Sequence, residues 1–311
     1  MRRYALRTAL LDMPDARRVH TRPTPRGGGA AIVIVTLTGV AAAGVLRMVP
    51  ASVVQAVMIG GGAVALVGWI DDRRGVPAPV RGAVHLAAAV WALAAGDVGL
   101  SPGTFALAAL WIVWSTNLYN FMDGIDGLAG IEAMSVGVLA GLMLFATGRA
   151  DLALVPLVTA AASAGFLAWN WPPARIFMGD VGSGFLGFVF GTMTVVSDRW
   201  GSVPAVTWLM LLGVFVFDAT VTLVRRVARR ERWYQAHRSH AYQRLVQRGI
   251  SPGKVGMAVL LFNGGAAGLA WIALVDRRLQ PACVVAEAVA LSMVYLAIER
   301  RVPMAAGESP P

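Results

Sequence analysis

Long apolar runs recur along the whole chain, and they restrict its fold more than any other feature of the sequence. A run of about 20 apolar residues can cross the hydrocarbon core of a membrane as an α-helix. The chain is 57% hydrophobic and only 14% charged, with a mean hydropathy of +0.64. Soluble domains carry about 25% charged residues. We therefore expect an all-α, polytopic integral membrane bundle.

Hydropathy predicts about ten membrane helices, at residues 28–46, 51–70, 82–96, 102–117, 127–147, 152–169, 182–197, 203–224, 255–275 and 281–298. They form a single integral membrane domain over residues 1–303. The remaining segment, 304–311, is polar and Pro-rich, and we expect a disordered tail. The only cysteine is Cys283, so the chain can form no internal disulfide.

Basic residues are distributed unevenly between the two sides that these helices define. Of the 27 Lys and Arg residues, 22 fall on one side, in residues 1–27, 71–81, 117–126, 170–181, 225–254 and 299–311. Loops rich in Lys and Arg face the cytoplasm. The sequence therefore predicts a bacterial inner-membrane protein with this side in the cytoplasm. The same rule accounts for the net charge of +10, so we expect a lipid bilayer and no nucleic acid as partner.

Polar motifs from four separate loops fall on this predicted cytoplasmic side. They are Asp71-Asp72, the segment "NLYNFMDGIDGLAG" at 117–130, Asp180 in "MGDVGSG", and the histidines of "HRSHAYQRL". Carboxylates at a membrane edge are costly unless they are paired, hydrated or bound to a cation. Carboxylate and amide oxygens suit Mg²⁺ or Mn²⁺ rather than zinc, and arginines bind phosphate. The motifs together predict metal-assisted phosphoryl chemistry.

Each motif also has a purely structural interpretation when it is taken alone. Asp71-Asp72 could be a charged helix end, and the two Asp-Gly steps of "DGIDG" are ordinary turn chemistry. Asn120 and Asp180 could cap helices. The structural interpretation weakens because all four motifs lie on the same side of the membrane.

The histidine motif and one intramembrane aspartate leave alternatives open. His237, His240 and Arg244 have the spacing of one helical face. That face could be solvated, or it could fold over the metal site. Asp218 lies within a predicted span, seven residues before Arg225, and an ion pair between them is one option.

The chain resembles the polyprenyl-phosphate N-acetylhexosamine-1-phosphate transferase superfamily, glycosyltransferase family 4, in the order of its motifs "GWIDDRRG", "NLYNFMDGIDGLAG", "FMGDVGSGFLG", "FDATVTLVRR" and "HRSHAYQRL". The segment "PTPRGGG" is similar to the N-terminal signature of that group. The resemblance implies transfer of a sugar 1-phosphate from a UDP-N-acetylhexosamine to undecaprenyl phosphate, with release of UMP. The form of "HRSHAYQRL" is most similar to the branch that initiates O-antigen and other surface polysaccharides.

The resemblance also implies roles for individual residues. Asn120 and Asp180 are expected to bind the metal. Asp71 and Asp72 are expected to position or deprotonate the lipid phosphate. The remaining motif residues are expected to contact the nucleotide or tune the metal, as for Asp123 and Asp126, or to bind substrate, as for Asn117, His237, His240, Arg244, Arg81 and Arg26.

Other functions and states remain as alternatives. The related phospho-MurNAc-pentapeptide translocase step is one, and a cation-coupled transporter, from another class, is a second. In the superfamily a membrane helix precedes "PTPRGGG", whereas residues 1–26 here contain no apolar span. We expect either that the helix is missing or that the start of the chain is misplaced. The chain could act alone or as a homodimer.

Overall fold

The computed structural model describes residues 2, 5, 11–12, 23–231 and 237–304. In these residues the single sheet pairs β1 (Leu11–Asp12) with β2 (Thr24–Pro25) in antiparallel orientation. All other regular structure is helical. The helical elements are α2 (Gly29–Val45), α3 (Ala51–Gln55), η1 (Ala56–Gly61), α4 (Gly62–Arg74), α5 (Ala78–Ala95), α6 (Pro102–Met122), α7 (Leu128–Ala146), α8 (Ala150–Asn170), α9 (Asp180–Arg199), α10 (Ala205–Leu211), α11 (Gly213–Ala228), α12 (Ala241–Gln247), α13 (Pro252–Val275), η2 (Arg277–Leu279) and α14 (Gln280–Arg301).

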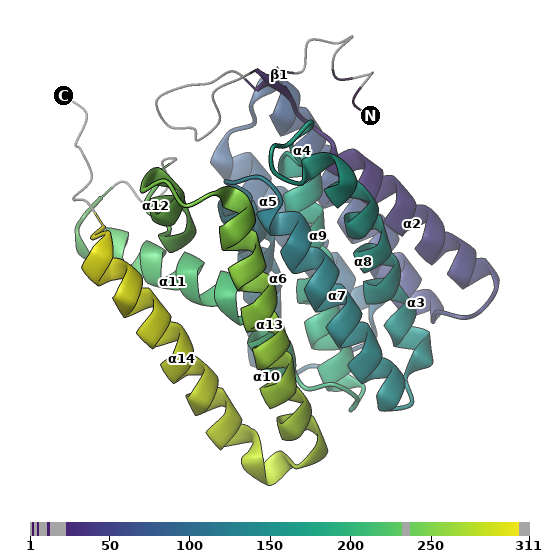
Figure 1. Cartoon of the computed structure of the whole chain (residues 1–311). Coiled ribbons are helices and arrows are strands. Elements are labelled where there is room, and N and C mark those ends of the chain that lie inside the picture. The colour runs from purple at the N-terminus through teal and green to yellow at the C-terminus, as the bar shows by residue number, and fades with distance from the viewer. Residues whose placement is uncertain (1, 3–4, 6–10, 13–22, 232–236, 305–311) are drawn as a thin grey trace.

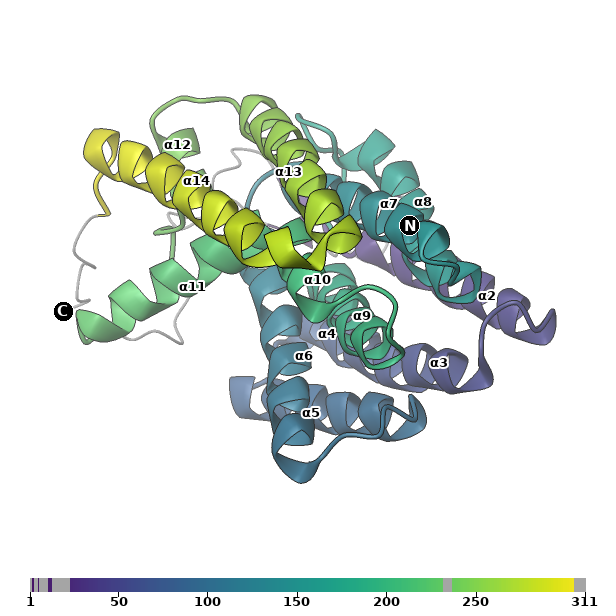
Figure 2. The same ribbon diagram turned by 90° about the horizontal axis from the view of Figure 1, so that it is seen from below.

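Helix α9 is the central element of the bundle, and the other long helices surround it (Figures 1 and 2). Its most apolar 18-residue window is 94% buried. Helices α4 and α6 pack along it, and the Ser115 hydroxyl of α6 donates a hydrogen bond to the Gly187 carbonyl at 2.8 Å. Helix α14 lies at the outside and diverges from the bundle, with only 17% of its window buried. Asp180 is therefore the first residue of the most deeply buried of the candidate membrane helices.

The all-α membrane architecture is confirmed, and each predicted span coincides with helical structure, in one case broken into two helices. Seven helical segments of the described chain are long and apolar enough to cross a membrane, and a bent pair would make an eighth. Helix α2, with 17 residues, is a shorter apolar helix. Ten membrane crossings therefore remain a prediction.

One predicted span is not a single helix. The sequence predicts a continuous helix over 203–224, but α10 ends at Leu211 and α11 begins at Gly213 after a bend of 82°. The apolar run alone could not reveal this break, because both arms are apolar. Helix α11 consequently runs across the polar end of the bundle, where Figure 1 shows it beneath α12.

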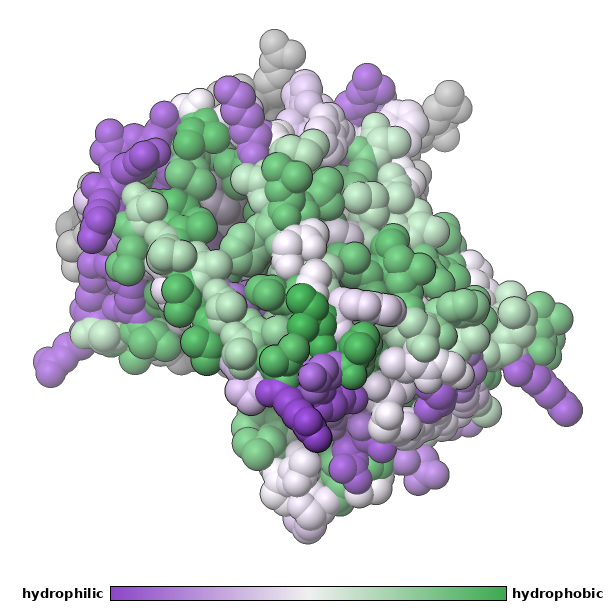
Figure 3. Space-filling view, turned by 60° about the horizontal axis from the view of Figure 1, so that its bottom comes forward, coloured by the Kyte–Doolittle hydropathy of each residue, from purple (hydrophilic) through white to green (hydrophobic). Residues whose placement is uncertain are grey.

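The surface agrees with a protein surrounded by lipid. Figure 3 shows apolar residues over much of one face, while hydrophilic residues gather at its left side and in a group in its lower middle. Large exposed side chains such as Leu107, Leu261 and Val275 are each about 70% exposed. A single apolar residue on a soluble surface is common, but a continuous apolar surface marks contact with another apolar phase.

The predicted tail lies mostly outside the described residues, which end at Met304. Met304 itself is buried and bonded to the bundle. Its N–H donates to Glu299 at 3.2 Å, and its carbonyl accepts from Arg229 at 3.1 Å.

Candidate active site

The polar motifs converge at one end of the bundle, the upper end in Figure 1. This end collects the C-terminal ends of α4 and α6 and the N-terminal ends of α5 and α9. A pocket between these four helices is lined by residues that include Arg81, His85, Asn117, Asn120, Phe121 and Asp180. The expected convergence of motifs from separate loops is therefore present in the fold.

Asp72 caps the central helix from a neighbouring helix. Its carboxylate accepts hydrogen bonds from the backbone N–H groups of Asp180 at 2.9 Å and Val181 at 3.2 Å. The first N–H groups of a helix have no partner within the helix, so an acidic side chain placed there is stabilising. The residue before the helix, Gly179, has a φ of +76°, which glycine adopts readily. Because the Asp72 side chain is fully buried, it is closed to solvent.

Gly68 allows α4 and α9 to approach closely at this point. A Cβ atom at Gly68 would lie 2.5 Å from the Asp180 carbonyl oxygen and 2.7 Å from the Val181 nitrogen. Atoms in real structures do not approach a Cβ so closely. A glycine one turn before Asp72 is thus a condition for the cap.

Two arginines bridge the carboxylates of the site. Arg26 pairs with Asp72 at 2.8 Å and with Asp180 at 2.5 Å. Arg81 pairs with Asp71 and lies 3.0 Å from the second oxygen of Asp180. Asp71 also accepts a hydrogen bond from the Val76 N–H at 2.5 Å.

The "PTPRGGG" segment places Arg26 through backbone pairing with the residues before α9. Phe177 N–H donates to the Pro25 carbonyl at 2.8 Å, and Gly28 N–H donates to the Phe177 carbonyl at 2.8 Å. Gly29 N–H donates to the Met178 carbonyl at 2.9 Å. Since this pairing lies on both sides of Arg26 in the sequence, it directs the arginine to the start of α9.

The amide residues of α6 line the pocket. The Asn120 side-chain nitrogen donates to the Ser183 hydroxyl of α9 at 3.4 Å. The Asn117 side chain donates to the Val113 carbonyl of its own helix at 2.8 Å. Asn120 and Asp180 therefore line one pocket from adjacent helices.

Asp123 follows α6 and lies close to the same carboxylates. Burial raises the pKa of Asp123 well above the usual range for an aspartate. The positive charge of Arg26 opposes this rise, and the charges of Asp180 and Asp72 add to it. The raised pKa is therefore caused chiefly by burial and, to a lesser extent, by the neighbouring carboxylates.

Asp126, from the same motif, has a different contact. One of its carboxylate oxygens accepts a hydrogen bond from the Ala174 N–H at 2.9 Å. This bond joins the loop after α6 to the loop that leads into α9. The contact supports a structural role for Asp126, beside the nucleotide or metal role that the resemblance implies.

The histidine motif folds against the end of α6. The Tyr242 hydroxyl donates to the Phe121 carbonyl at 2.9 Å, and the His240 ring lies 6.4 Å from the Phe121 ring. Phe121 in turn lines the pocket. The segment therefore lies beside the site and does not hang free.

The expected single helical face of His237, His240 and Arg244 is not present. Helix α12 begins at Ala241, with His240 at its N-cap position and His237 in an extended segment before it. The two imidazole rings nevertheless lie 4.9 Å apart, centre to centre. The i,i+3 spacing was misleading because Asp218 starts the helix at Ala241.

Asp218 caps α12 in the way that Asp72 caps α9. It accepts hydrogen bonds from the Ala241 N–H at 3.0 Å and the Tyr242 N–H at 3.3 Å, and lies 3.5 Å from Nδ1 of His240. The option of an ion pair between Asp218 and Arg225 is wrong. Arg225 makes two bonds of 2.7 Å to Glu299 of α14 instead.

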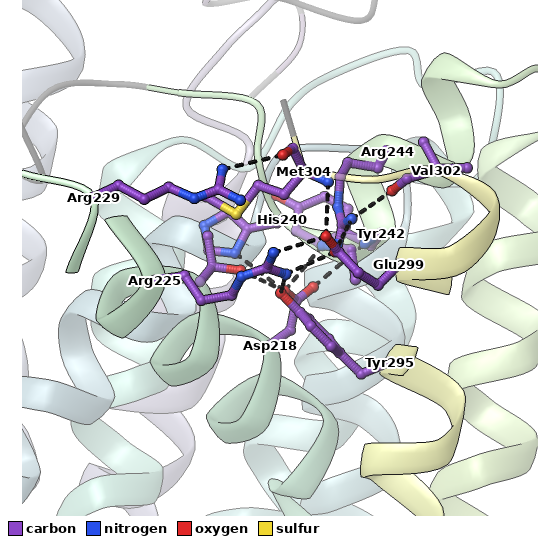
Figure 4. A network of polar contacts seen from close by, with 12 residues as sticks. Asp218, Arg225, Arg229, His240, Tyr242, Arg244, Tyr295, Glu299, Val302 and Met304 are labelled. Atoms are coloured by element: carbon purple, nitrogen blue, oxygen red, sulfur yellow. Dashed lines mark hydrogen bonds and ion pairs between the residues drawn. The ribbon is translucent and has the colours of Figure 1, made fainter. Parts of the chain in front are cut away.

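Arg244 also turns toward α14. Figure 4 shows Arg244, Arg225 and Glu299 close to Val302 and Met304, above Asp218 and Tyr295. Arg244 donates to Glu299 at 2.6 Å and to the Val302 carbonyl at 2.5 Å. The guanidinium of Arg244, which the resemblance assigns to the UDP-sugar, therefore already contacts Glu299 and Val302.

Sequence reasoning missed two residues of this region. His85 lines the pocket, and its position four residues after Arg81 on α5 was a usable signal, because such pairs share a helical face. Glu299 left no such signal, since its partner Arg244 is 55 residues away in the chain.

Comparison with known proteins finds the same family that the sequence motifs resemble. The family model for "Glycosyl transferase family 4" matches residues 54–198, which contain the pocket residues of α4, α5, α6 and α9. A probable undecaprenyl-phosphate N-acetylglucosaminyl 1-phosphate transferase of Bacillus subtilis is 31% identical over 271 residues, which cover 81% of this chain and 74% of the relative.

Two further relatives carry related names. A decaprenyl-phosphate N-acetylglucosaminephosphotransferase of Mycolicibacterium smegmatis is 28% identical over 305 residues, covering 85% of this chain and 75% of the relative. A phospho-N-acetylmuramoyl-pentapeptide-transferase of Lacticaseibacillus paracasei is 34% identical over 139 residues, covering 44% of this chain and 41% of the relative.

Proposed function

Because this chain belongs to glycosyl transferase family 4, among the polyprenyl-phosphate hexosamine-1-phosphate transferases, we propose that it transfers an N-acetylhexosamine 1-phosphate from a UDP-sugar to undecaprenyl phosphate. One observation carries the proposal: Asp180, Asn120 and Arg81 line a single pocket at the polar end of an apolar bundle. A water-soluble donor and a membrane-bound acceptor can meet only at such an end.

In the proposed reaction an oxygen of the lipid phosphate attacks the β-phosphorus of the UDP-sugar. The bond between the two phosphates of the donor breaks, and UMP leaves with the bonding electron pair. A new P–O–P bond joins the sugar phosphate to the lipid phosphate. Both substrates are anionic, so their approach requires positive charge in the site.

Mg²⁺, or Mn²⁺ in its place, fits the residues of this site. Among the described residues, the four carboxylates of Asp71, Asp72, Asp123 and Asp180 lie close to two arginines, Arg26 and Arg81. A divalent cation would balance the excess of carboxylates over arginines among these described residues. No three His, Cys, Asp or Glu side chains of the described chain form a metal cluster by themselves. Mg²⁺ is commonly held by one or two carboxylates together with substrate phosphates.

We assign Asp180 and Asn120 as the residues that would hold this ion, which would supply charge neutralisation to the phosphates when bound. Asp71 is assigned to the lipid phosphate, because its carboxylate is less buried than that of Asp72. Asp72 is assigned a positioning role, because it holds the first N–H groups of α9 and so places Asp180. Arg26 and Arg81 exchange carboxylate partners for phosphate oxygens when substrates bind.

On the donor side we assign His237, His240 and Arg244, together with Asn117 in the pocket. The packing of the histidine segment on Phe121 supports this assignment. We further propose that the polar end faces the cytoplasm of a bacterial inner membrane, on the charge distribution of the loops. Within the superfamily we favour the branch that initiates surface polysaccharides, on the form of "HRSHAYQRL".

The test is transfer of label from UDP-N-acetylglucosamine or UDP-N-acetylgalactosamine to undecaprenyl phosphate by the purified protein with Mg²⁺. We expect labelled lipid from the wild type, and none from Asp180→Asn or Asn120→Ala at unchanged folded yield. Asp97→Asn, in the exposed loop between α5 and α6, is the matched control and should keep full activity. Near-normal turnover by Asp180→Asn at limiting Mg²⁺ would contradict the metal assignment. Transfer from UDP-MurNAc-pentapeptide alone would support the peptidoglycan alternative.

A further inference from the structure

Glu299, near the end of α14, joins three segments that are far apart in the sequence. It accepts two hydrogen bonds of 2.7 Å from Arg225 of α11 and one of 2.6 Å from Arg244 of α12. It also accepts a hydrogen bond from the Met304 N–H at 3.2 Å. Figure 4 shows these partners around the Glu299 carboxylate. The last helix thus anchors both elements that carry the histidine segment.

Arg244 is only 3% exposed, yet half of its guanidinium has no partner within the described residues. Nη1 bonds to Glu299 and to the Val302 carbonyl, whereas Nε and Nη2 are buried without a hydrogen bond. A buried donor without an acceptor is costly, and a charged donor more so. Nε and Nη2 form the edge of the guanidinium that binds a phosphate or carboxylate with two parallel hydrogen bonds.

Charges around Arg244 also favour an anion at this edge. Two guanidiniums, Arg225 and Arg244, share the single carboxylate of Glu299. The nearby carboxylate of Asp218 is already occupied by two backbone N–H groups, the Thr222 hydroxyl and the His240 ring. Within the described residues, Arg244 therefore shares its carboxylate partner with a second guanidinium, one helical turn after His240.

We propose that Glu299 is a positioning residue for the donor phosphates. It holds Nη1 of Arg244, and Arg225 keeps Glu299 in place, so that the Nε–Nη2 edge of Arg244 binds an oxygen of the donor diphosphate. This inference rests on the proposed function, since it takes a nucleoside diphosphate as the ligand. Glu299 itself contacts no substrate and acts only through Arg244.

The experiment measures binding of UDP, the part common to all UDP-sugars, to the purified full chain, followed by steady-state kinetics with each substrate varied. Glu299→Gln keeps the shape of the side chain but not its charge. We expect UDP to bind about tenfold more weakly to this variant, with the KM for undecaprenyl phosphate within about twofold of wild type. Asp151→Asn removes a comparable carboxylate from an ion pair with Arg149 at the start of α8, and should change neither value.

A second variant distinguishes loss of the guanidinium edge from a general loss of stability. Arg244→Lys keeps a charge for Glu299 but has no guanidinium edge, so we expect the same loss of UDP affinity at a wild-type melting temperature. UDP affinity equal to wild type in either variant, or equal losses for both substrates, would overturn the inference. A wild type that does not bind UDP would overturn the proposed function instead, and the inference with it.

Discussion

Oδ1 of Asp72 accepts a hydrogen bond from the backbone N–H of Asp180 at 2.9 Å, so a residue of α4 caps the helix that begins with the proposed metal ligand. Both carboxylate oxygens of Asp72 are occupied, since Oδ2 accepts from Val181 and Oδ1 also pairs with Arg26. The adjacent aspartates of "GWIDDRRG" therefore have different surroundings. Asp71 reaches toward Arg81, and Asp72 organises the start of α9.

Asp72→Asn should separate the positioning role from a direct chemical role. An asparagine offers one acceptor oxygen and no charge, so it cannot satisfy both N–H groups and Arg26. We expect a loss of about 1–2 kcal/mol in stability, typical of a lost cap. We also expect a kcat reduced more than tenfold, with more Mg²⁺ needed for half-maximal activity. A kcat loss at an unchanged Mg²⁺ requirement would indicate that Asp72 acts on the lipid phosphate directly.

Gly68→Ala should disturb the same contact from the other side. The new Cβ would press on the Asp180 carbonyl, which belongs to the backbone and cannot rotate away. We expect a lower melting temperature and loss of transfer activity. Gly62→Ala, on the same helix, is the matched control, because a Cβ there meets nothing within 4 Å. Alanine in a helix is favoured over glycine by about 0.5–1 kcal/mol, so the control should be slightly stabilised. Equal effects of both substitutions would refute the close-contact argument.

His240→Ala tests the donor assignment of the histidine segment. The ring is 3% exposed and lies between Asp218 and the aromatic rings of Phe121 and Tyr242. We expect kcat/KM for the UDP-sugar to fall about ten- to a hundredfold, the cost of one charge-assisted hydrogen bond of about 1.5–3 kcal/mol. The KM for undecaprenyl phosphate should change little.

Arg248→Ala is the control for that experiment, because Arg248 is an exposed cation just after α12. It should leave both kinetic parameters near wild type. If His240→Ala matched wild type within twofold when the UDP-sugar is varied, His240 would have only a packing role.

The orientation in the membrane can be tested with single cysteines, because the native Cys283 is buried. Arg74→Cys, at the exposed end of α4, should react with a membrane-impermeant reagent only after the cell is opened. Ala150→Cys, at the exposed start of α8 on the opposite end, should react in intact cells with a permeable outer membrane. The reverse labelling pattern would place the polar end outside the cytoplasm and exclude the proposed donor.

The sequence determined the positions of the helices and the convergence of the motifs. Apolar runs with polar or Gly/Pro boundaries place helix ends within a few residues, and local signals add precision, as where Ser101 accepts from the Thr104 N–H at the start of α6. Because successive membrane helices alternate in direction, motifs that the sequence places at helix ends on one side lie at the same end of the bundle. That is why Asn120 and Asp180, 60 residues apart, could be assigned to one site from sequence.

The contacts within the site were decided only by tertiary structure. Asp72 meets Asp180 across 108 residues, and Arg244 meets Glu299 across 55. No spacing rule links such pairs, because their approach depends on how closely helices pack and where a helix bends. The 82° bend at Leu212 turns α11 across the polar end, and Asp218 then starts α12 at Ala241, which removes the helical face that the spacing of the histidines suggested. Hydropathy and periodicity describe one segment at a time, whereas a cap or an ion pair between helices depends on the packing of all of them.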